Sequence, residues 1–168
     1  MFAATTGRVH VFVALLATLL LSACGFHLRE QIVLPAALQK VSLEFADPLT
    51  PLRRDLAAAL KRAGAEVVAT GTEGVGVIRV PVDSILTEPL TVSDAARVQE
   101  YVVRYRVELE VVDAAGKVLL PRAAIELTRD YSFDETQALG AAAEDELLRE
   151  ELQREMVQQV LRRIQAIH

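Results

Sequence analysis

The residues best suited to nucleophilic or metal chemistry are one cysteine, Cys24, and three histidines, His10, His27 and His168. They stand near the beginning of the chain or at its last position, so residues 28–167 contain neither cysteine nor histidine. Ser-His and Cys-His nucleophilic systems and the usual zinc ligand sets need these side chains. We therefore expect no enzyme activity, no metal site and no cofactor.

Two other patterns could still carry chemistry. The glycine-bearing segment 71–76 does not match GxGxxG and is followed by no GK[ST], which indicates an ordinary loop. Asp130, Asp134 and Glu135 are close in sequence, but such carboxylates usually lie at solvated loop ends or helix N-caps. Neither pattern favours catalysis.

Cys24 has a more specific context. Residues 11–21 form an apolar run that only Thr18 interrupts, too short for a membrane-spanning helix and typical of a secretory signal. Leu21, Ser22, Ala23 and Cys24 follow in an order that resembles a bacterial lipobox. The resemblance implies cleavage before Cys24 and lipid on its thiol and amine. A soluble secreted protein with a free cysteine is the less favoured alternative.

Length and charge limit the remaining functions. With 168 residues the chain has room for one ordinary domain. Lysine and arginine number 18 against 23 acidic residues, a net charge of −5, and no basic run occurs, which argues against nucleic-acid binding. We expect a signal peptide over residues 1–23, a lipid-anchored tether over 24–39 and a single α/β domain over 40–168.

The first half of this domain predicts alternating strands and a helix. Residues 40–45 alternate with period two and predict a strand. Thr50 and Pro51 predict the N-cap and first position of a helix that stops at Gly64. Residues 66–69 could add a short strand. A strand is expected over 77–86, with Pro81 at a sheet edge or a bulge, followed by a polar excursion over 87–96.

The second half predicts a long hairpin. Residues 98–112 place apolar side chains at odd positions and charged ones at even positions, typical of a sheet with one covered face. In the next strand, 118–133, the apolar residues are also odd-numbered, whereas a two-residue turn would pair odd with even. We therefore predict a one-residue bulge near Gly116 or Pro121, which brings Glu126 near Arg104.

A long helix completes the predicted fold. Apolar residues recur at three- and four-residue steps from about residue 136 to 167. The order β-α-β-β-β-α predicts an α+β, two-layer sandwich: a mixed sheet of about four strands with two helices packed on one face.

Several short motifs together resemble the LptE family of lipopolysaccharide-assembly lipoproteins. They follow in order along nearly the whole chain after the signal, and they are residues 24–29 (CGFHLR), 34–35 (LP), 100–101 (EY), Arg129 with 131–134 (YSFD), 155–156 (EM) and 158–163 (QQVLRR). Each is weak alone. Their order and spacing make a chance match improbable.

This resemblance implies a binding function. The chain would associate 1:1 with LptD, a large outer-membrane β-barrel, plug it, aid its assembly and assist delivery of lipopolysaccharide. Lipid on Cys24 would hold it at the outer membrane. The next residue is Gly25 and not the Asp that would retain a lipoprotein in the inner membrane, which also favours the outer membrane. The alternatives are an accessory lipoprotein of a phospholipid or ABC-type envelope transport machine and, disfavoured by the missing histidine, a lipoprotein hydrolase.

Direct contact with lipopolysaccharide would need local cations for its phosphates, because the net charge has the wrong sign. The candidates are Arg97, Arg104, Arg106 and Arg129. The competing interpretation of each is a solvated or ion-paired strand arginine. Residues 138–143 carry no lysine or arginine, so no basic site is predicted there.

Overall fold

The structure is a computed structural model that describes residues 33–134 and 138–167, all within one compact unit. The chain forms, in order, a short 3-10 helix, five strands and two long helices. These are η1 (Ala36–Leu38), β1 (Lys40–Phe45), α2 (Pro51–Arg62), β2 (Glu66–Val68), β3 (Gly76–Val92), β4 (Val98–Val112), β5 (Val118–Ser132) and α3 (Ala138–Gln165).

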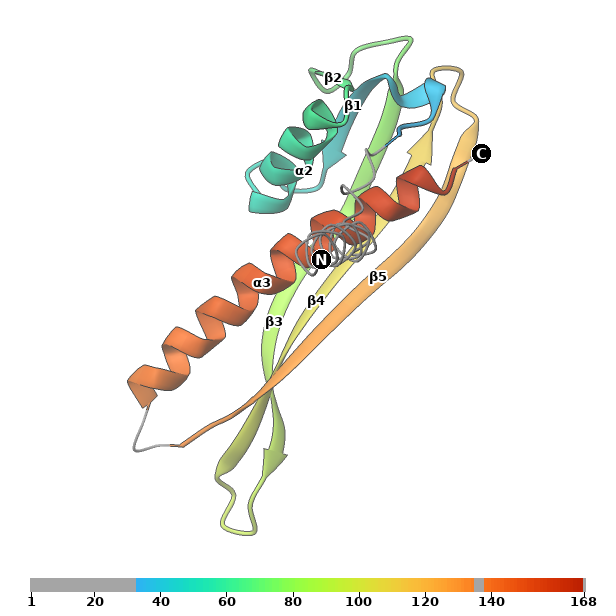
Figure 1. The fold of residues 1–168 in the computed structure, drawn as a ribbon. Helices are drawn as coiled ribbons and strands as arrows, with labels where there is room; N and C mark the ends of the chain where they lie inside the picture. Colours follow the sequence, from blue (N-terminus) through green and yellow to red (C-terminus); the bar gives the residue numbers. More distant parts are fainter. Residues whose placement is uncertain (1–32, 135–137, 168) are drawn as a thin grey trace, which may run out of the picture. The chain divides into compact units, whose positions relative to one another are not determined.

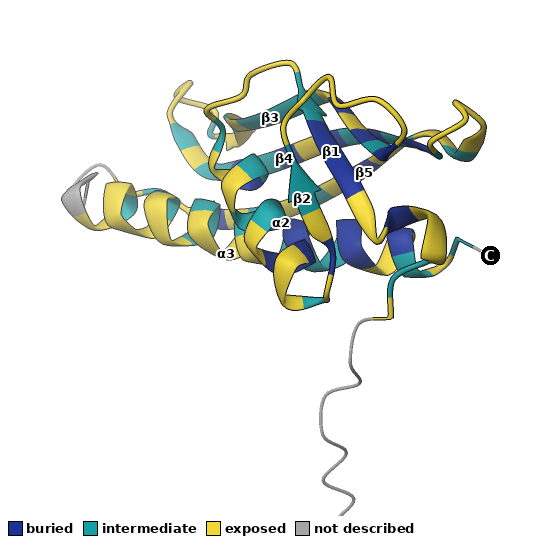
Figure 2. Cartoon of the chain, turned by 90° about the horizontal axis from the view of Figure 1, so that it is seen from above, coloured by how far each residue is buried: buried dark blue, intermediate teal, exposed yellow. Residues whose placement is uncertain are grey.

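The strands form one mixed sheet in the order β2-β1-β3-β4-β5. β1 is parallel to β2 and β3, whereas β3, β4 and β5 are antiparallel neighbours. Both helices cover the same face, which leaves the other face open (Figures 1 and 2). The predicted two-layer α+β fold is confirmed, with five strands instead of about four because the three-residue β2 adds an edge.

The local signals around α2 act as expected. Thr50 caps the helix by accepting a hydrogen bond at Oγ1 from the backbone N–H of Arg53, and Pro51 occupies the first position. Gly64, at φ +92°, takes the left-handed conformation that ends the helix. Leu52, Leu56 and Leu60 face the core with 1% exposure or less.

β3 is longer than its sequence predicts. The polar excursion expected after residue 86 is wrong, because the strand continues to Val92. Two polar residues of this extension form hydrogen bonds with other elements: Thr87 donates to Asp145 of α3, and Glu88 accepts from Arg104 of β4. A register shift between Arg79 and Val82 confirms a bulge at Pro81, and the edge alternative is wrong because β3 is the central strand.

The β4–β5 hairpin confirms the predicted odd-to-odd pairing: Tyr105 lies opposite Leu127, and Val107 opposite Ile125. The number of inserted residues differs from the prediction of one. Gly116, at φ +81°, completes a three-residue turn, one residue longer than a two-residue turn. β5 then has one extra residue at each of two register shifts, between Val118 and Leu120 and between Leu120 and Ala123. The longer turn and these two bulges together insert three residues, and three, like one, pairs odd positions with odd positions.

The core lies between the sheet and the two helices. From α3 it takes Leu152, Met156, Val160 and Ile164, all fully buried, and odd-numbered residues of β4 cover them from the sheet side. The part of α3 before Leu148 contributes no fully buried side chain among the described positions. None of the described helices is long and apolar enough to cross a membrane.

Candidate functional site: the open face of the sheet and the strand–helix contact

Cys24 and His27 lie outside the described residues, so lipidation at Cys24 stays a prediction. The last residues of the predicted tether, by contrast, are packed on the domain. Leu38 is fully buried, and a Cβ added at Gly76 would lie 2.8 Å from the carbonyl oxygen of Ala37 and 2.8 Å from Leu38 Cδ2. This close approach holds η1 against the start of β3.

Arg104 and Arg106, two of the predicted lipopolysaccharide contacts, lie on the open face of the sheet. Arg104 forms ion pairs with Glu88 on β3 and Glu126 on β5. This confirms the expected proximity of Arg104 and Glu126. Arg106 also contacts Glu126, at 3.7 Å, and a second carboxylate, Glu108, at 2.6 Å. Both guanidinium groups therefore already have carboxylate partners.

These pairs belong to a longer chain of alternating charges across the open face, which we call the open-face network. Its members are Glu88, Arg104, Glu126, Arg106, Glu108 and Arg122. Hydrogen bonds from Arg106 and Arg122 lower the pKa of Glu108. A separate triad, Glu44–Arg79–Glu110, ties β1, β3 and β4 together on the same face. The open face is thus polar, with its charges largely matched.

The other two candidate arginines lie elsewhere. Arg129 is opposite the buried Val103, on the helix-covered side, and its guanidinium lies 2.6 Å from Glu155 of α3. Arg97 lies where the β3–β4 turn ends, and its backbone N–H donates to Ser93 Oγ. The structure therefore brings only Arg104 and Arg106 together.

A polar cluster joins the early part of α3 to the sheet, and we call it the Asp145 hub. Asp145 Oδ1 accepts hydrogen bonds from Thr87 Oγ1 at 2.6 Å and from Tyr131 Oη at 3.4 Å. Its other oxygen, Oδ2, lies 2.6 Å from Arg149 Nε. Burial opposes ionisation of Asp145, but the bonds from Thr87 and Arg149 outweigh it and lower the pKa. The i,i+4 spacing predicts the Asp145–Arg149 pair, whereas no sequence signal points to Thr87.

Aromatic side chains adjoin this hub. The Tyr101 and Tyr131 rings stack with centroids 5.7 Å apart, and Phe133 meets Tyr101 edge-on at 5.2 Å. These residues belong to the motifs that suggested a family, as do Arg129 and Glu155. Their contacts explain the motifs structurally: they fasten β4, β5 and α3 to one another.

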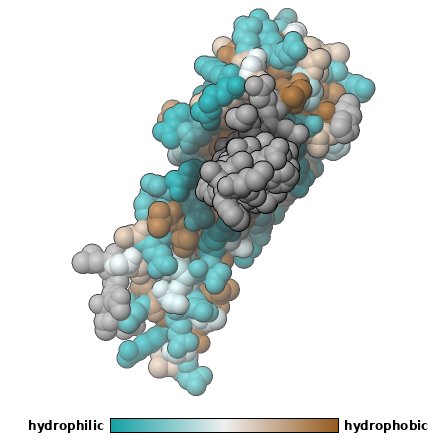
Figure 3. All heavy atoms as spheres, in the orientation of Figure 1, coloured by the Kyte–Doolittle hydropathy of each residue, from teal (hydrophilic) through white to brown (hydrophobic). Residues whose placement is uncertain are grey.

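The described residues offer little for catalysis. They include no group of three or more His, Cys, Asp or Glu side chains placed to hold a metal ion. Of the carboxylate cluster considered for acid–base chemistry, Glu135 lies outside the described residues. Asp134 lines a groove of about 360 Å³ together with Glu144 on α3. The visible surface is mainly hydrophilic with separate apolar patches (Figure 3).

Fold and site together define a small α+β domain with a polar sheet face, and comparison with known proteins identifies its family. The LptE family, described as "Lipopolysaccharide-assembly", matches residues 38–164. The chain belongs to the LptE family.

Individual relatives agree. The chain is 26% identical over 153 residues to the LPS-assembly lipoprotein LptE of Photorhabdus laumondii, covering 91% of this chain and 83% of the relative. It is 26% identical over 162 residues to that of Pectobacterium atrosepticum, covering 96% and 87%.

Solved structures share the fold. A solution structure of an uncharacterized lipoprotein B from Nitrosomonas europaea has a TM-score of 0.71 at 30% identity, covering 84% of this chain and 91% of that one. The rare lipoprotein B of Shewanella oneidensis gives a TM-score of 0.63 at 28% identity, covering 73% and 91%.

Proposed function

We propose that this LptE-family protein is an outer-membrane lipoprotein, anchored through Cys24, that binds and plugs an LptD-like β-barrel in a 1:1 complex. In this function it aids barrel assembly and the delivery of lipopolysaccharide to the outer leaflet. The role is binding, with no turnover.

The open-face network is the observation that carries the plug proposal. The interior of a large outer-membrane barrel is polar and filled with water, so the surface of a plug must be polar and must be stable in contact with water. The open face meets this need because its arginines and glutamates neutralise one another across β3, β4 and β5. A partner wall with its own polar groups can then exchange ion pairs and hydrogen bonds with it.

Among the candidate lipopolysaccharide contacts, Arg104 and Arg106 are the best placed. Their ion pairs are solvent-exposed, and exposed pairs contribute little stability, so a phosphate can replace a carboxylate at modest cost. A guanidinium also binds phosphate through two parallel hydrogen bonds. We retain Arg97 and Arg129 as secondary candidates.

The first test is a pull-down with the tagged full chain from detergent-solubilised outer membranes. We expect one large β-barrel protein at equal amount. An inner-membrane-linked transporter component would favour the accessory-lipoprotein alternative, and no stoichiometric partner would contradict the plug.

A second test separates lipopolysaccharide binding from barrel binding. Arg104→Gln combined with Arg106→Gln should weaken binding of purified lipopolysaccharide several-fold, because two phosphate partners are lost. The matched control is Arg54→Gln combined with Arg154→Gln, which removes two arginines that are ion-paired on the helices. Equal loss in both variants would contradict a site on the open face.

A further inference from the structure

One end of the domain gathers cations that form no ion pair within the described part of the chain. We call this end the tether pole, because the described chain begins there at Val33. It comprises η1, the start of β1, the C-terminal ends of α2 and α3, the β2–β3 loop and the β4–β5 turn (Figure 1). The β3–β4 turn, residues 93–97, lies at the opposite end of the sheet.

The exposed cations at this pole differ from those elsewhere in the described chain. Within residues 33–134 and 138–167, six lysines and arginines have no ion-pair partner. Five of them lie at the tether pole, whereas the sixth, Arg53, lies in the first turn of α2. The five are Lys61, Arg62, Lys117, Arg162 and Arg163. On the sheet, by comparison, arginines such as Arg79, Arg104 and Arg122 are paired.

The charge balance reverses between this pole and the remainder. With Lys40 included, the tether pole carries six cations against three carboxylates, Glu66, Glu73 and Asp113. Lys40 pairs with Glu66, and Asp113 accepts backbone N–H groups of its own turn. The other described residues carry ten cations against eighteen carboxylates. A domain that is acidic overall therefore presents one basic end.

Helix ends account for part of this pattern. Four of the five cations stand in the last turns of α2 and α3, where positive charge is favoured by the helix dipole. Lys117 is in a β-turn, so no helix dipole explains it. It precedes Val118, whose side chain is 47% exposed, and Val33 at the same pole is 75% exposed. Exposed apolar side chains beside unpaired cations are typical of surfaces that contact lipid headgroups.

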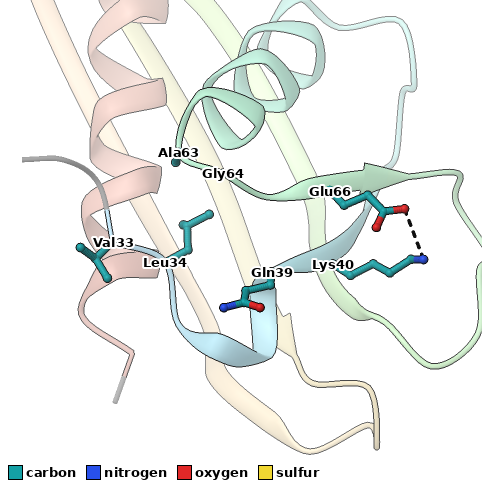
Figure 4. Close-up of a pocket in the computed structure, with 7 residues that line it drawn as sticks. All are labelled: Val33, Leu34, Gln39, Lys40, Ala63, Gly64 and Glu66. Carbon is teal, nitrogen blue, oxygen red and sulfur yellow. Dashed lines mark ion pairs between the residues drawn. The ribbon is translucent and has the colours of Figure 1, made fainter.

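The pole is also hollowed beside the point where the chain enters. A groove of about 630 Å³ is lined by residues on either side of η1, by the starts of β1 and β2 and by the turn after α2 (Figure 4). The residues are Val33, Leu34, Gln39, Lys40, Ala63, Gly64 and Glu66. The last turns of α3 pass beside Val33 and Leu34 in the same view. The side chains of Lys40 and Glu66, which both line this groove, form an ion pair with each other. Cationic helix ends thus flank the entry of the tether.

The length of the tether places this pole near the membrane. Nine residue steps separate Cys24 from Val33, and an extended chain spans at most about 3.5 Å per step, or roughly 30 Å in all. If Cys24 carries lipid, the tether pole can reach the bilayer surface, where attraction to anionic headgroups acts within a Debye length of about 10 Å.

We propose that the tether pole docks on anionic phospholipid headgroups of the membrane that holds the anchor. This inference rests on the proposed lipidation of Cys24 and is independent of barrel binding. The contact orients the domain, so that the β3–β4 turn and the distal half of the sheet point away from the lipid surface. The lipid anchor attaches the protein to the membrane, and the tether pole fixes the orientation of the domain on it.

The test uses the lipidated full chain in vesicles, with a fluorophore at Ala115→Cys beside Lys117. Because the thiol of the only native cysteine is blocked by lipid under the proposal, the label reacts at position 115 alone. Headgroup-labelled lipid should quench this fluorophore at least about twofold more in phosphatidylcholine vesicles containing phosphatidylglycerol than in phosphatidylcholine alone, and salt should remove the difference.

Two variants that remove the same charge give the test its specificity. The pole variant should lose the phosphatidylglycerol effect, and it combines Lys61→Gln, Arg62→Gln, Arg162→Gln and Arg163→Gln. The control variant should keep the effect, and it combines Arg53→Gln, Arg54→Gln, Arg79→Gln and Arg154→Gln, which all lie away from the tether pole and outside the proposed lipopolysaccharide site. Equal quenching in both vesicle types, or equal loss in both variants, would overturn the proposal.

An anchor-free measurement provides a second readout. The full mature chain with Cys24→Ser should co-sediment with phosphatidylglycerol vesicles, and each pole cation removed should weaken partitioning by roughly fivefold. Arg62→Gln should show this loss and Arg53→Gln should not, although both are on α2. If Cys24 takes up the fluorophore in the first experiment, the proposed lipid anchor is wrong. If Cys24 is blocked but the pole variant still behaves as wild type, membrane docking is wrong and the barrel proposal is unaffected.

Discussion

Individual arginines on this domain take their roles from the carboxylates around them. Arg129 lies beside Glu155 of α3, so it links a strand to a helix. Arg149 and Asp145 form a partly buried pair that also engages Thr87 and Tyr131, whereas Arg154 and Glu150 form an exposed pair on the same helix. The two i,i+4 pairs have the same spacing in sequence. Burial and extra partners make only the first one structurally important.

Replacing Asp145 with Asn should therefore lower the free energy of unfolding by about 1–3 kcal/mol, because Thr87, Tyr131 and Arg149 lose a charged acceptor. Urea unfolding followed by circular dichroism measures the change. Glu150→Gln, which breaks the exposed pair, should cost less than about 0.5 kcal/mol. Similar costs for the two variants would contradict this difference.

The Asp145 hub should also make stability depend on acid pH. The pKa of Asp145 lies below its ordinary value of 3.8 in the folded protein, so its stabilising contribution is complete above that value and is lost as the pH falls through the folded pKa. The stability difference between wild type and Asp145→Asn should be constant from about pH 7 to pH 5 and shrink below pH 3.8. A difference that grows on acidification would contradict the sign.

At the scale of elements, close backbone approaches hold the N-terminal pieces together. Gly76 begins β3 where η1 packs against it. A side chain at position 76 would clash with the carbonyl oxygen of Ala37 and with the side chain of Leu38. Gly140 is different, because a Cβ there would meet nothing within 4 Å. Glycine is thus required for packing at the first position but not at the second.

Gly76→Ala should destabilise the fold by about 1–3 kcal/mol, because the backbone of Ala37 must move to make room. Gly140→Ala, in α3, should instead stabilise it by about 0.5–1 kcal/mol through helix propensity. Thermal unfolding of the two variants measures opposite shifts of Tm. A stabilising Gly76→Ala would show that η1 is not held at that contact.

At the scale of the whole molecule, the sheet and both helices share one core. Leu56 of α2, Val103 of β4 and Met156 of α3 belong to the same cluster and are fully buried. A single core of this kind favours cooperative unfolding.

Met156→Ala should accordingly cost about 2–5 kcal/mol and keep a single transition that far- and near-ultraviolet circular dichroism report at the same urea concentration. Leu147→Ala, at a side chain 58% exposed on the same helix, should cost less than about 0.5 kcal/mol. Separate transitions for helix and sheet signals would show that α3 is not an integral part of the core.

The sequence by itself determined which segments form strands and helices and where most of them end. Thr50, Pro51 and Gly64 act through hydrogen bonds and backbone preferences within a few residues, so local spacing reveals them. The odd-numbered apolar positions of β4 and β5 likewise required an odd number of inserted residues, because only matched parity places both apolar faces on one core.

Tertiary structure alone decided which residues of the sheet meet residues of α3. Thr87 and Asp145 are far apart in sequence, and so are Arg129 and Glu155. Whether such residues meet depends on strand order and on which face the helices cover. The same contacts let β3 continue through Thr87 and Glu88 to Val92, because polar side chains that read locally as a loop are stabilised in a strand once distant partners satisfy them.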